Sequence, residues 1–243
     1  MAAGEGKRMN SIIPKVLHRF KEVPMLVRVI EAARQLSPQN ILIITGKYYD
    51  FIDSVLRQYT TIDDIIYVDQ VRPLGTGDAI RSCLYYYEGE ANVLILNGDM
   101  PLITADILRR FIADSDTIGK DVYTGSILCA WFENPTGYGR IVTSIDGGGN
   151  IQRIVEEKDC STEEREIKIV NAGIYLFPSD VLREYIPKIG NQNTQKEYYL
   201  TDIVELVSGG SGGYVRAFVI PEADNKYISG ANTQAELAAL ELL

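Results

Sequence analysis

The chain has 243 residues, of which 46% are hydrophobic and 23% charged, and its net charge at pH 7 is −9. This composition excludes a disordered or fibrous chain, and the acidic balance argues against a nucleic-acid partner or an anionic membrane surface. The absence of a bilayer-length apolar run and of a secretory signal, together with an odd count of three cysteines, predicts a cytoplasmic protein that does not enter the membrane.

The first half of the chain alternates between helix-like and strand-like segments. Apolar residues at helical spacing separate short, continuous apolar runs of the kind that form buried parallel strands. The predicted order is a helix at 24–33, a strand at 41–44, a helix at 51–56, a strand at 65–68, a helix at 77–88, a strand at 93–96 and a helix at 105–113. This rhythm predicts a Rossmann-like α/β fold, an open and mostly parallel sheet with helices on both faces. Ligands of such sheets bind at the carboxyl ends of the strands.

The second half of the chain contains strand-like segments with little helix between them. They lie at 122–130, 140–145, 151–156, 168–177 and 214–219, with a tight turn at Gly147–Gly149 and a surface loop at 208–213. This pattern predicts a mixed sheet that carries an added β-hairpin layer. The end of the chain, 233–243, is apolar at helical spacing, so we expect a helix that packs back onto the protein or meets a partner.

The N-terminal segment is locally basic inside an acidic protein. Residues 1–21 contain five bases, Lys7, Arg8, Lys15, Arg19 and Lys21, against one acid, Glu5. Small residues at 2–6 allow backbone N–H groups to approach an anion, and Arg8 and Lys15 can add charge-assisted contacts to phosphate oxygens. The spacing matches neither the P-loop nor the dinucleotide-binding pattern. A solvated charged loop is the alternative interpretation.

Two further segments follow predicted strands. Asp99 comes directly after the strand at 93–96, where a carboxylate can bind Mg²⁺; the alternative is a turn residue that caps the helix beginning near Thr104. The glycines of Gln70–Gly77 allow close approach of a flat ligand, and Gln70 can pair with the edge of a nucleobase. This segment is equally interpretable as an ordinary turn between a strand and a helix.

Polar turns at 134–140, 156–158 and 171–173 suit a hydroxyl-rich ligand such as a sugar. The only histidine, His18, is interpreted as structural, since a lone histidine is more often structural than catalytic. A Ser-His-Asp set would have to use His18, and no Cys/His cluster has zinc spacing. Nucleophilic and zinc hydrolases are therefore disfavoured.

Eight segments occur in an order that is specific to one family. They are Met1–Met9 (MAAGEGKRM), Pro14–His18 (PKVLH), Gln70–Ala79 (QVRPLGTGDA), Gly98–Ile103 (GDMPLI), Asn134–Ile141 (NPTGYGRI), Ile154–Asp159 (IVEEKD), Asn171–Tyr175 (NAGIY) and Glu197–Ile203 (EYYLTDI). Together they cover nearly the whole chain and resemble the N-terminal pyrophosphorylase domain of the bacterial bifunctional N-acetylglucosamine-1-phosphate uridyltransferases.

This resemblance implies a nucleotide-diphospho-sugar transferase-like fold and Mg²⁺-dependent nucleotidyl transfer from UTP to N-acetylglucosamine 1-phosphate. It implies one domain over 1–243, with a nucleotide-binding half at 1–120 and a sugar-binding half at 121–243. By the matching positions, the resemblance implies that Arg8 and Lys15 bind the triphosphate and stabilise the transition state, and that Asp99 and Asn232 bind Mg²⁺. It implies nucleotide contacts from Ala3 and Gly4 and uracil contacts from Gln70, Gly75 and Thr76. It also implies that the sugar is contacted by Gly139, Glu156 and Asn171.

The chain departs from the family pattern at three places. Lys7 stands where the family usually has threonine, and Asp78 stands where it has histidine, which adds negative charge near the nucleotide. The family also has an apolar strand before the segment that begins at Ala2, so we expect either a truncated or misplaced start or a sheet that closes differently. We expect no left-handed β-helix acetyltransferase domain, and therefore neither acetyltransferase activity nor a trimer imposed by that domain.

Two alternatives to the uridylyltransferase stay open. One is a related sugar-phosphate nucleotidyltransferase for another sugar or base. The motifs NPTGYGRI and EYYLTDI favour the uridylyltransferase over this alternative. The other is a non-catalytic nucleotide- or sugar-binding paralogue, which Asp78 and the missing strand favour. The sequence indicates no oligomeric state.

Overall fold

The computed structural model describes residues 1–4, 6–87, 89, 91–115, 123–143, 150–210 and 213–243. Within it the chain forms two compact units: unit 1 consists of Met1–Pro73, Leu96–Arg110 and Lys226–Leu243, and unit 2 of Leu74–Ile95 and Phe111–Asn225. Both units therefore draw on both of the halves expected from the sequence. That the chain acts as a single nucleotidyltransferase domain, without an acetyltransferase domain, stays a prediction. Three predicted features lie wholly or partly outside the described residues. They are the turn at Gly147–Gly149, residues Ser211 and Gly212 of the predicted loop, and the side chain of Lys7.

Unit 1 contains a parallel pair of strands and the helices that pack on it. Its strands are β1 (Arg19–Phe20), β2 (Val23–Pro24), β3 (Ile41–Ile44) and β4 (Ile65–Val68). Its helices are α1 (Met25–Arg34), α2 (Tyr49–Tyr59), α8 (Gln234–Glu241) and the first part of α4 (Ala105–Asp114). Its short 3₁₀ helices are η1 (Lys7–Met9), η2 (Lys15–Leu17) and η3 (Gly46–Tyr48). β3 and β4 pair in parallel from Ile41 opposite Ile65 to Ile44 opposite Val68. β1 and β2 form a short antiparallel hairpin.

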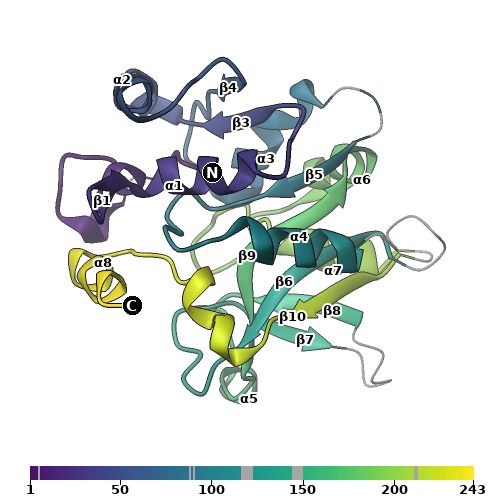
Figure 1. Cartoon of the computed structure of the whole chain (residues 1–243). Coiled ribbons are helices and arrows are strands. Elements are labelled where there is room, and N and C mark those ends of the chain that lie inside the picture. The colour runs from purple at the N-terminus through teal and green to yellow at the C-terminus, as the bar shows by residue number, and fades with distance from the viewer. Residues whose placement is uncertain (5, 88, 90, 116–122, 144–149, 211–212) are drawn as a thin grey trace. The chain divides into compact units, whose positions relative to one another are not determined.

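The core of unit 1 has two apolar clusters. In the first, Leu26 and Ile30 of α1 pack with Ile43 of β3 and with Ile52 and Leu56 of α2, as the helical spacing of α1 and α2 predicts. The second consists of Met9, Phe20, Met25, Ala231, Leu237 and Leu240. Figure 1 shows α8, which carries the last two of these residues, beside β1. Of the two expectations for the C-terminal helix, the structure confirms that it packs back.

Hydrogen bonds anchor the first residues of the chain inside unit 1. The Met1 ammonium donates to the Leu96 carbonyl (2.7 Å), and the Met1 carbonyl accepts from Gly98 N (3.0 Å). Ala2 N donates to the carbonyl of Ile44, the last residue of β3 (3.0 Å). The small-residue segment therefore starts from a fixed point at the ends of two strand segments.

Unit 2 is built on a six-stranded sheet. Its strands are β5 (Asn92–Ile95), β6 (Gly125–Trp131), β7 (Arg140–Thr143), β8 (Asn150–Val155), β9 (Ile169–Pro178) and β10 (Val215–Val219), in the order β5-β9-β6-β10-β8-β7, with β9 also pairing with β7. Its helices are α3 (Thr76–Cys83), α5 (Thr162–Arg165), α6 (Ser179–Tyr185) and α7 (Asp202–Ser208), with 3₁₀ helices η4 (Leu84–Tyr86) and η6 (Ile186–Lys188); η7 (Glu222–Ile228) crosses the boundary between the units. α7 packs against β8 and β10, and α6 packs against β9.

The mixed α/β architecture is confirmed, with fewer parallel neighbours than the sequence predicts. In this sheet β6 and β10 are parallel, whereas β5–β9, β6–β9, β7–β8, β7–β9 and β8–β10 are antiparallel. Parallel neighbours need a crossover of about a dozen residues or more, usually a helix. In the described residues between β6 and β9 the only helix is the short α5, beside the strands β7 and β8. β7 and β8 form the expected antiparallel pair at one end of the strand order. No helix in the described part of the chain is long and apolar enough to cross a bilayer.

Candidate functional site

Four of the expected site residues meet in unit 1. The Lys15 ammonium donates to Asp99 Oδ2 (2.5 Å) and to Asn232 Oδ1 (3.2 Å), and Arg8 Nη2 donates to the same Asn232 oxygen (2.9 Å). The side chains of Lys15 and Asp99 are 19% and 13% exposed. Lys15 begins η2, Asp99 follows the Leu96 segment, and Asn232 precedes α8, so residues more than 200 positions apart form one cluster of charged and polar groups.

The backbone around this cluster fixes its oxygen atoms. Ala231 N donates to the Asp99 carbonyl (3.2 Å), and a Cβ on Gly230 would lie 3.3 Å from Asp99 Oδ2. Asn232 N donates to Glu236 Oε2 (2.7 Å) in the first turn of α8. Gly230 and Glu236 are thus parts of the site that sequence reasoning gave no role, whereas their neighbour Asn232 was assigned through the resemblance.

Asp99 does not cap the following helix. Thr104 Oγ1 accepts from Ile107 N (3.4 Å) and so takes the capping position at the start of α4, while the Asp99 carboxylate pairs with Lys15. The interpretation of Asp99 as a helix cap is therefore wrong, and its carboxylate faces a cation instead.

The donor set of Asp99 and Asn232 fits Mg²⁺. One carboxylate oxygen and one amide oxygen converge on a single cationic group, the Lys15 ammonium, so the two oxygens lie close enough to share a cation. Among the described residues no group of three or more His, Cys, Asp or Glu side chains could hold a metal. Mg²⁺ suits a site with few protein ligands, because it usually keeps several waters and is completed by substrate phosphates.

The residues expected near the nucleotide in unit 1 are Ala3, Gly4 and Gln70. Ala3 and Gln70 are buried, whereas Gly4 is exposed and a Cβ there would meet open space. Gly46, with φ +51°, lies between the first two: its Cβ would be 3.4 Å from Ala3 Cβ and 3.2 Å from the Gln70 carbonyl oxygen. Gly46 brings Ala3 and Gln70 together, and the only signal for it in the sequence is a glycine that closely follows a predicted strand.

Gly75 and Thr76 lie in unit 2, where they dock on the Tyr198–Leu200 segment. Gly77 N donates to the Tyr198 carbonyl (2.7 Å), Tyr198 N donates to the Leu74 carbonyl (2.8 Å), and Leu200 N donates to Thr76 Oγ1 (2.9 Å). Gly75 has φ +123°, and a Cβ there would lie 2.5 Å from the Tyr198 carbonyl oxygen. Glycine is therefore required at this position by both the conformation and the close approach of another backbone.

Asp78, the departure from the family pattern, lies in the first turn of α3 and is half-buried. A carboxylate at a helix N-terminus is favoured by the helix dipole. The acid at this position therefore has a local structural reason that is independent of any ligand.

The three residues expected to contact the sugar lie together in unit 2. Asn171 N donates to the Gly139 carbonyl (2.9 Å). A Cβ on Gly139 would lie 3.7 Å from both Asn171 Cβ and Glu156 Cδ. Glu156 Oε1 accepts from Thr201 Oγ1 (3.1 Å). Thr201 belongs to the EYYLTDI motif, but sequence reasoning gave it no contact.

An irregularity in β9 sets the orientation of Asn171. β9 shifts register against β6, so that Leu128 pairs with Ile174 while the next residue, Cys129, pairs with Asn171. Asn171 Oδ1 accepts from Gly173 N (2.8 Å), and its Nδ2 donates to the Tyr175 hydroxyl (2.7 Å). A side-chain amide has two donor and two acceptor positions, so these two bonds fix the side chain and leave it capacity for a ligand.

Two half-buried acids, Glu156 and Asp202, have raised pKa values in and near this second cluster. Burial raises the pKa of Glu156 above its ordinary value, the hydrogen bond from Thr201 opposes that change, and the carboxylates of Asp159 and Glu197 reinforce it. Burial also raises the pKa of Asp202 to about 6, with smaller contributions from neighbouring carboxylates. A ligand here meets half-buried carboxyl groups that can form hydrogen bonds with it.

Comparison with known proteins places the chain in a family. The model for the MobA-like NTP transferase domain matches residues 1–135. Among solved structures, a putative glucose-1-phosphate thymidylyltransferase from Bacillus anthracis superposes with a TM-score of 0.72 at 19% identity, covering 99% of this chain and 92% of that chain. At this identity the likeness concerns the fold, and it confirms the predicted nucleotidyltransferase architecture.

Curated relatives are more similar in sequence. A probable UDP-N-acetylglucosamine pyrophosphorylase of Acanthamoeba polyphaga mimivirus is 37% identical over 243 residues, covering 99% of this chain and 93% of the relative. The bifunctional protein GlmU of Caldanaerobacter subterraneus subsp. tengcongensis is 39% identical over 241 residues, covering 99% of this chain, which spans about half the length of that relative. The resemblance found in the eight motifs is confirmed, and the chain belongs to the MobA-like NTP transferase family.

Proposed function

We propose that the protein catalyses nucleotidyl transfer from UTP to N-acetylglucosamine 1-phosphate, giving UDP-N-acetylglucosamine and pyrophosphate. The observation that carries the chemistry is the convergence of Arg8 and Lys15 on the oxygens of Asp99 and Asn232. The choice of substrates is supported by a relative named as a probable UDP-N-acetylglucosamine pyrophosphorylase, 37% identical over nearly the whole of both chains.

In this reaction a phosphate oxygen of the sugar phosphate forms a bond to the α-phosphorus of UTP while the bond to the pyrophosphate oxygen breaks. No proton has to be removed from the attacking phosphate, so catalysis depends on positioning and on neutralising charge. Lys15 and Arg8 bind the triphosphate and stabilise the negative charge that moves to the leaving pyrophosphate. Ala3 and Gly4 offer backbone groups to the nucleotide, and Gln70, Gly75 and Thr76 contact the uracil.

Asp99 and Asn232 would hold the Mg²⁺ ion, which supplies neutralisation of phosphate charge when it is bound. The Lys15 ammonium donates hydrogen bonds to the same two oxygens in the structure. It therefore lies next to the proposed Mg²⁺ site, where the phosphates would bind. Gly139, Glu156 and Asn171 would bind the sugar through its hydroxyl and amide groups. The three cysteines are free and buried, which supports a reducing compartment such as the cytoplasm.

The test is release of pyrophosphate by the purified chain with UTP, Mg²⁺ and a panel of sugar 1-phosphates and nucleoside triphosphates. We expect release with UTP and N-acetylglucosamine 1-phosphate that stops when EDTA removes the metal. Faster release with another sugar or base would identify a related nucleotidyltransferase instead. Binding of UTP by the folded chain without release from any pair would contradict the enzymatic proposal.

A further inference from the structure

The loop of residues 134–139 leads into β7 and carries Gly139. Its internal hydrogen bonds close two small turns: Asn134 Oδ1 accepts from Thr136 N (3.2 Å) and from Thr136 Oγ1 (2.7 Å), and Tyr138 N donates to the Pro135 carbonyl (3.2 Å). Gly137, with φ +90°, allows the chain to reverse. These turns give the loop its shape but do not fix where the loop lies.

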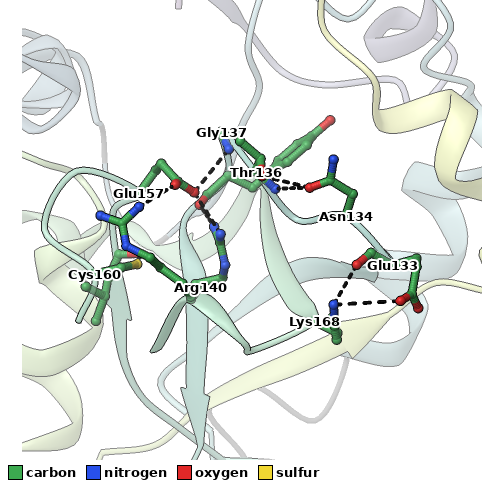
Figure 2. Close-up of polar contacts among 11 residues, drawn as sticks. Glu133, Asn134, Thr136, Gly137, Arg140, Glu157, Cys160 and Lys168 are labelled. Atoms are coloured by element: carbon green, nitrogen blue, oxygen red, sulfur yellow. Dashed lines mark hydrogen bonds and ion pairs between the residues drawn. The ribbon is translucent and has the colours of Figure 1, made fainter. Parts of the chain in front are cut away.

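Glu157 and Arg140, which lie outside the loop in the sequence, form hydrogen bonds with the loop backbone (Figure 2). Glu157 Oε2 accepts from Gly137 N (3.1 Å) and from Arg140 Nη2 (2.7 Å). Arg140 Nη1 in turn donates to the Tyr138 carbonyl, and Arg165 Nη1 donates to the second carboxylate oxygen of Glu157 (3.2 Å). The pair therefore bonds to the two residues that precede Gly139 in the chain.

Glu157 is the residue on which this arrangement depends. The Arg140 side chain is 2% exposed, so its charge needs a partner inside the protein. Burial acts to raise the pKa of Glu157, but hydrogen bonds from Arg140 and from Gly137 N outweigh it and hold this pKa below its ordinary value, so the carboxylate is charged at neutral pH. Glu156 and Glu157 follow β8 directly and make different contacts, Glu156 with Thr201 and Glu157 with the loop.

We propose that Glu157 is a positioning residue for the sugar phosphate, which sets the backbone of Gly139 against Glu156 and Asn171 through Gly137 and Arg140. The inference rests on the proposed function, because it takes those three residues as the sugar site. The carboxylate touches no substrate. It fixes the loop so that the Gly139 carbonyl meets Asn171 N and the site has one shape before the ligand arrives.

The kinetic test uses Glu157→Gln, which keeps the size of the side chain but removes its charge and one acceptor oxygen. A displacement of the loop by about 1 Å is expected to raise the KM for N-acetylglucosamine 1-phosphate by roughly ten- to a hundredfold, with the KM for UTP unchanged. The control is Glu164→Gln, which removes another Glu–Arg pair, Glu164 with Arg153 at 2.7 Å, while glutamine still supports the capping box of α5. Equal changes in both KM values, or none, would overturn the proposal.

Amide hydrogen exchange gives a second readout that needs no activity. In Glu157→Gln the amides of Gly137 and Asn171 are expected to exchange faster than in the wild type, while exchange in β6 is unchanged. The melting temperature is expected to fall, because the buried Arg140 loses its charged partner. Unchanged protection at both amides would contradict the positioning role. If the wild type shows no turnover with any sugar phosphate, the proposed function fails, and the exchange experiment still decides whether Glu157 fixes the loop.

Discussion

The candidate clusters of unit 1 and unit 2 differ in the charge of the groups that they offer to a ligand. In unit 1, Lys15 neutralises the Asp99 carboxylate, and Lys15 and Arg8 both donate to the Asn232 amide oxygen, in a partly exposed cluster. In unit 2, Glu156 is a half-buried acid whose pKa is raised by loss of hydration, and its described side-chain partner is the Thr201 hydroxyl group. The first arrangement suits an anion that brings its own charge, and the second suits a neutral, hydroxyl-rich group.

In the proposed reaction, this difference separates two kinds of contribution. Charge that moves during the reaction is stabilised by groups like those of unit 1, so their removal lowers kcat. Groups like those of unit 2 bind equally before and during the reaction, so their loss raises KM. Substitutions that mix these two effects would break the comparison.

The largest effect is expected for Lys15→Met. Removing the ammonium eliminates a cation that faces both Asp99 and Asn232, and we expect kcat to fall by about 10²–10³-fold. The measurement is steady-state release of pyrophosphate at saturating substrates. Lys226→Met, at an exposed lysine of the same unit, controls for the loss of one positive charge. If Lys15→Met raised only the KM for the sugar phosphate, the division between the clusters would be wrong.

A smaller effect is expected for Gly139→Ala. The added Cβ would lie 3.0 Å from Ile154 Cγ2 and would face Glu156 and Asn171, so the site must shift to accept it. We expect the KM for the sugar phosphate to rise by about tenfold while kcat stays within about twofold. Gly190→Ala, where a Cβ meets nothing within 4 Å, is the matched control. A fall in kcat with an unchanged KM would place Gly139 with the reacting groups.

The smallest effect concerns the stability cost of the acids in unit 2. Because the pKa of Asp202 is raised to about 6 in the folded protein, its ionised form destabilises the fold above pH 6. This cost is relieved as the pH falls through 6 and is absent near pH 4. Asp202→Asn should therefore raise the free energy of unfolding at pH 8 by about 1 kcal/mol, after allowance for the solvent-exposed part of the side chain.

Urea unfolding of wild type and Asp202→Asn at pH 8 and pH 4.5 measures this difference. Asp180→Asn is the control, since Asp180 lies in the first turn of another short helix, α6, but is exposed. A gain that is as large at pH 4.5 as at pH 8 would mean that ionisation of Asp202 is not its cause, because only about a third of an ionisation-linked gain remains at pH 4.5.

Local patterns in the sequence predicted the elements of unit 1 well. β3 and β4 occupy the predicted residues 41–44 and 65–68, and α1 differs by one residue at each end. α6 and α7 were missed because they have seven residues each, too few turns for helical periodicity to emerge. The pairing of strands in unit 2 also could not be predicted, since it depends on which distant segments meet.

The site was predictable as a set of residues and not as an arrangement. Lys15 and Asp99 lie 84 positions apart, and neither carries a signal for the other except through resemblance to a family. Gly46 and Thr201 were missed because their importance lies in contacts across the fold, which a single glycine or threonine does not reveal. Burial opposes the shift at Glu157, but hydrogen bonds from Arg140 and Gly137 N lower its pKa, whereas burial raises the pKa of Asp202. Both environments depend on how the chain folds and cannot be seen in the sequence.

The packing of α8 determines when unit 1 can be completed during synthesis. Leu237 and Leu240 share a cluster with Met9 and Phe20, and Gln234 Nε2 donates to the Met9 carbonyl (3.0 Å). The N-terminal segment leaves the ribosome first, but its partners are translated more than 200 residues later, and contacts of such long separation form slowly. Until α8 has emerged, Met9 and Phe20 lack their cover, so this cluster stays incomplete while the more than 200 residues between them and α8 are translated.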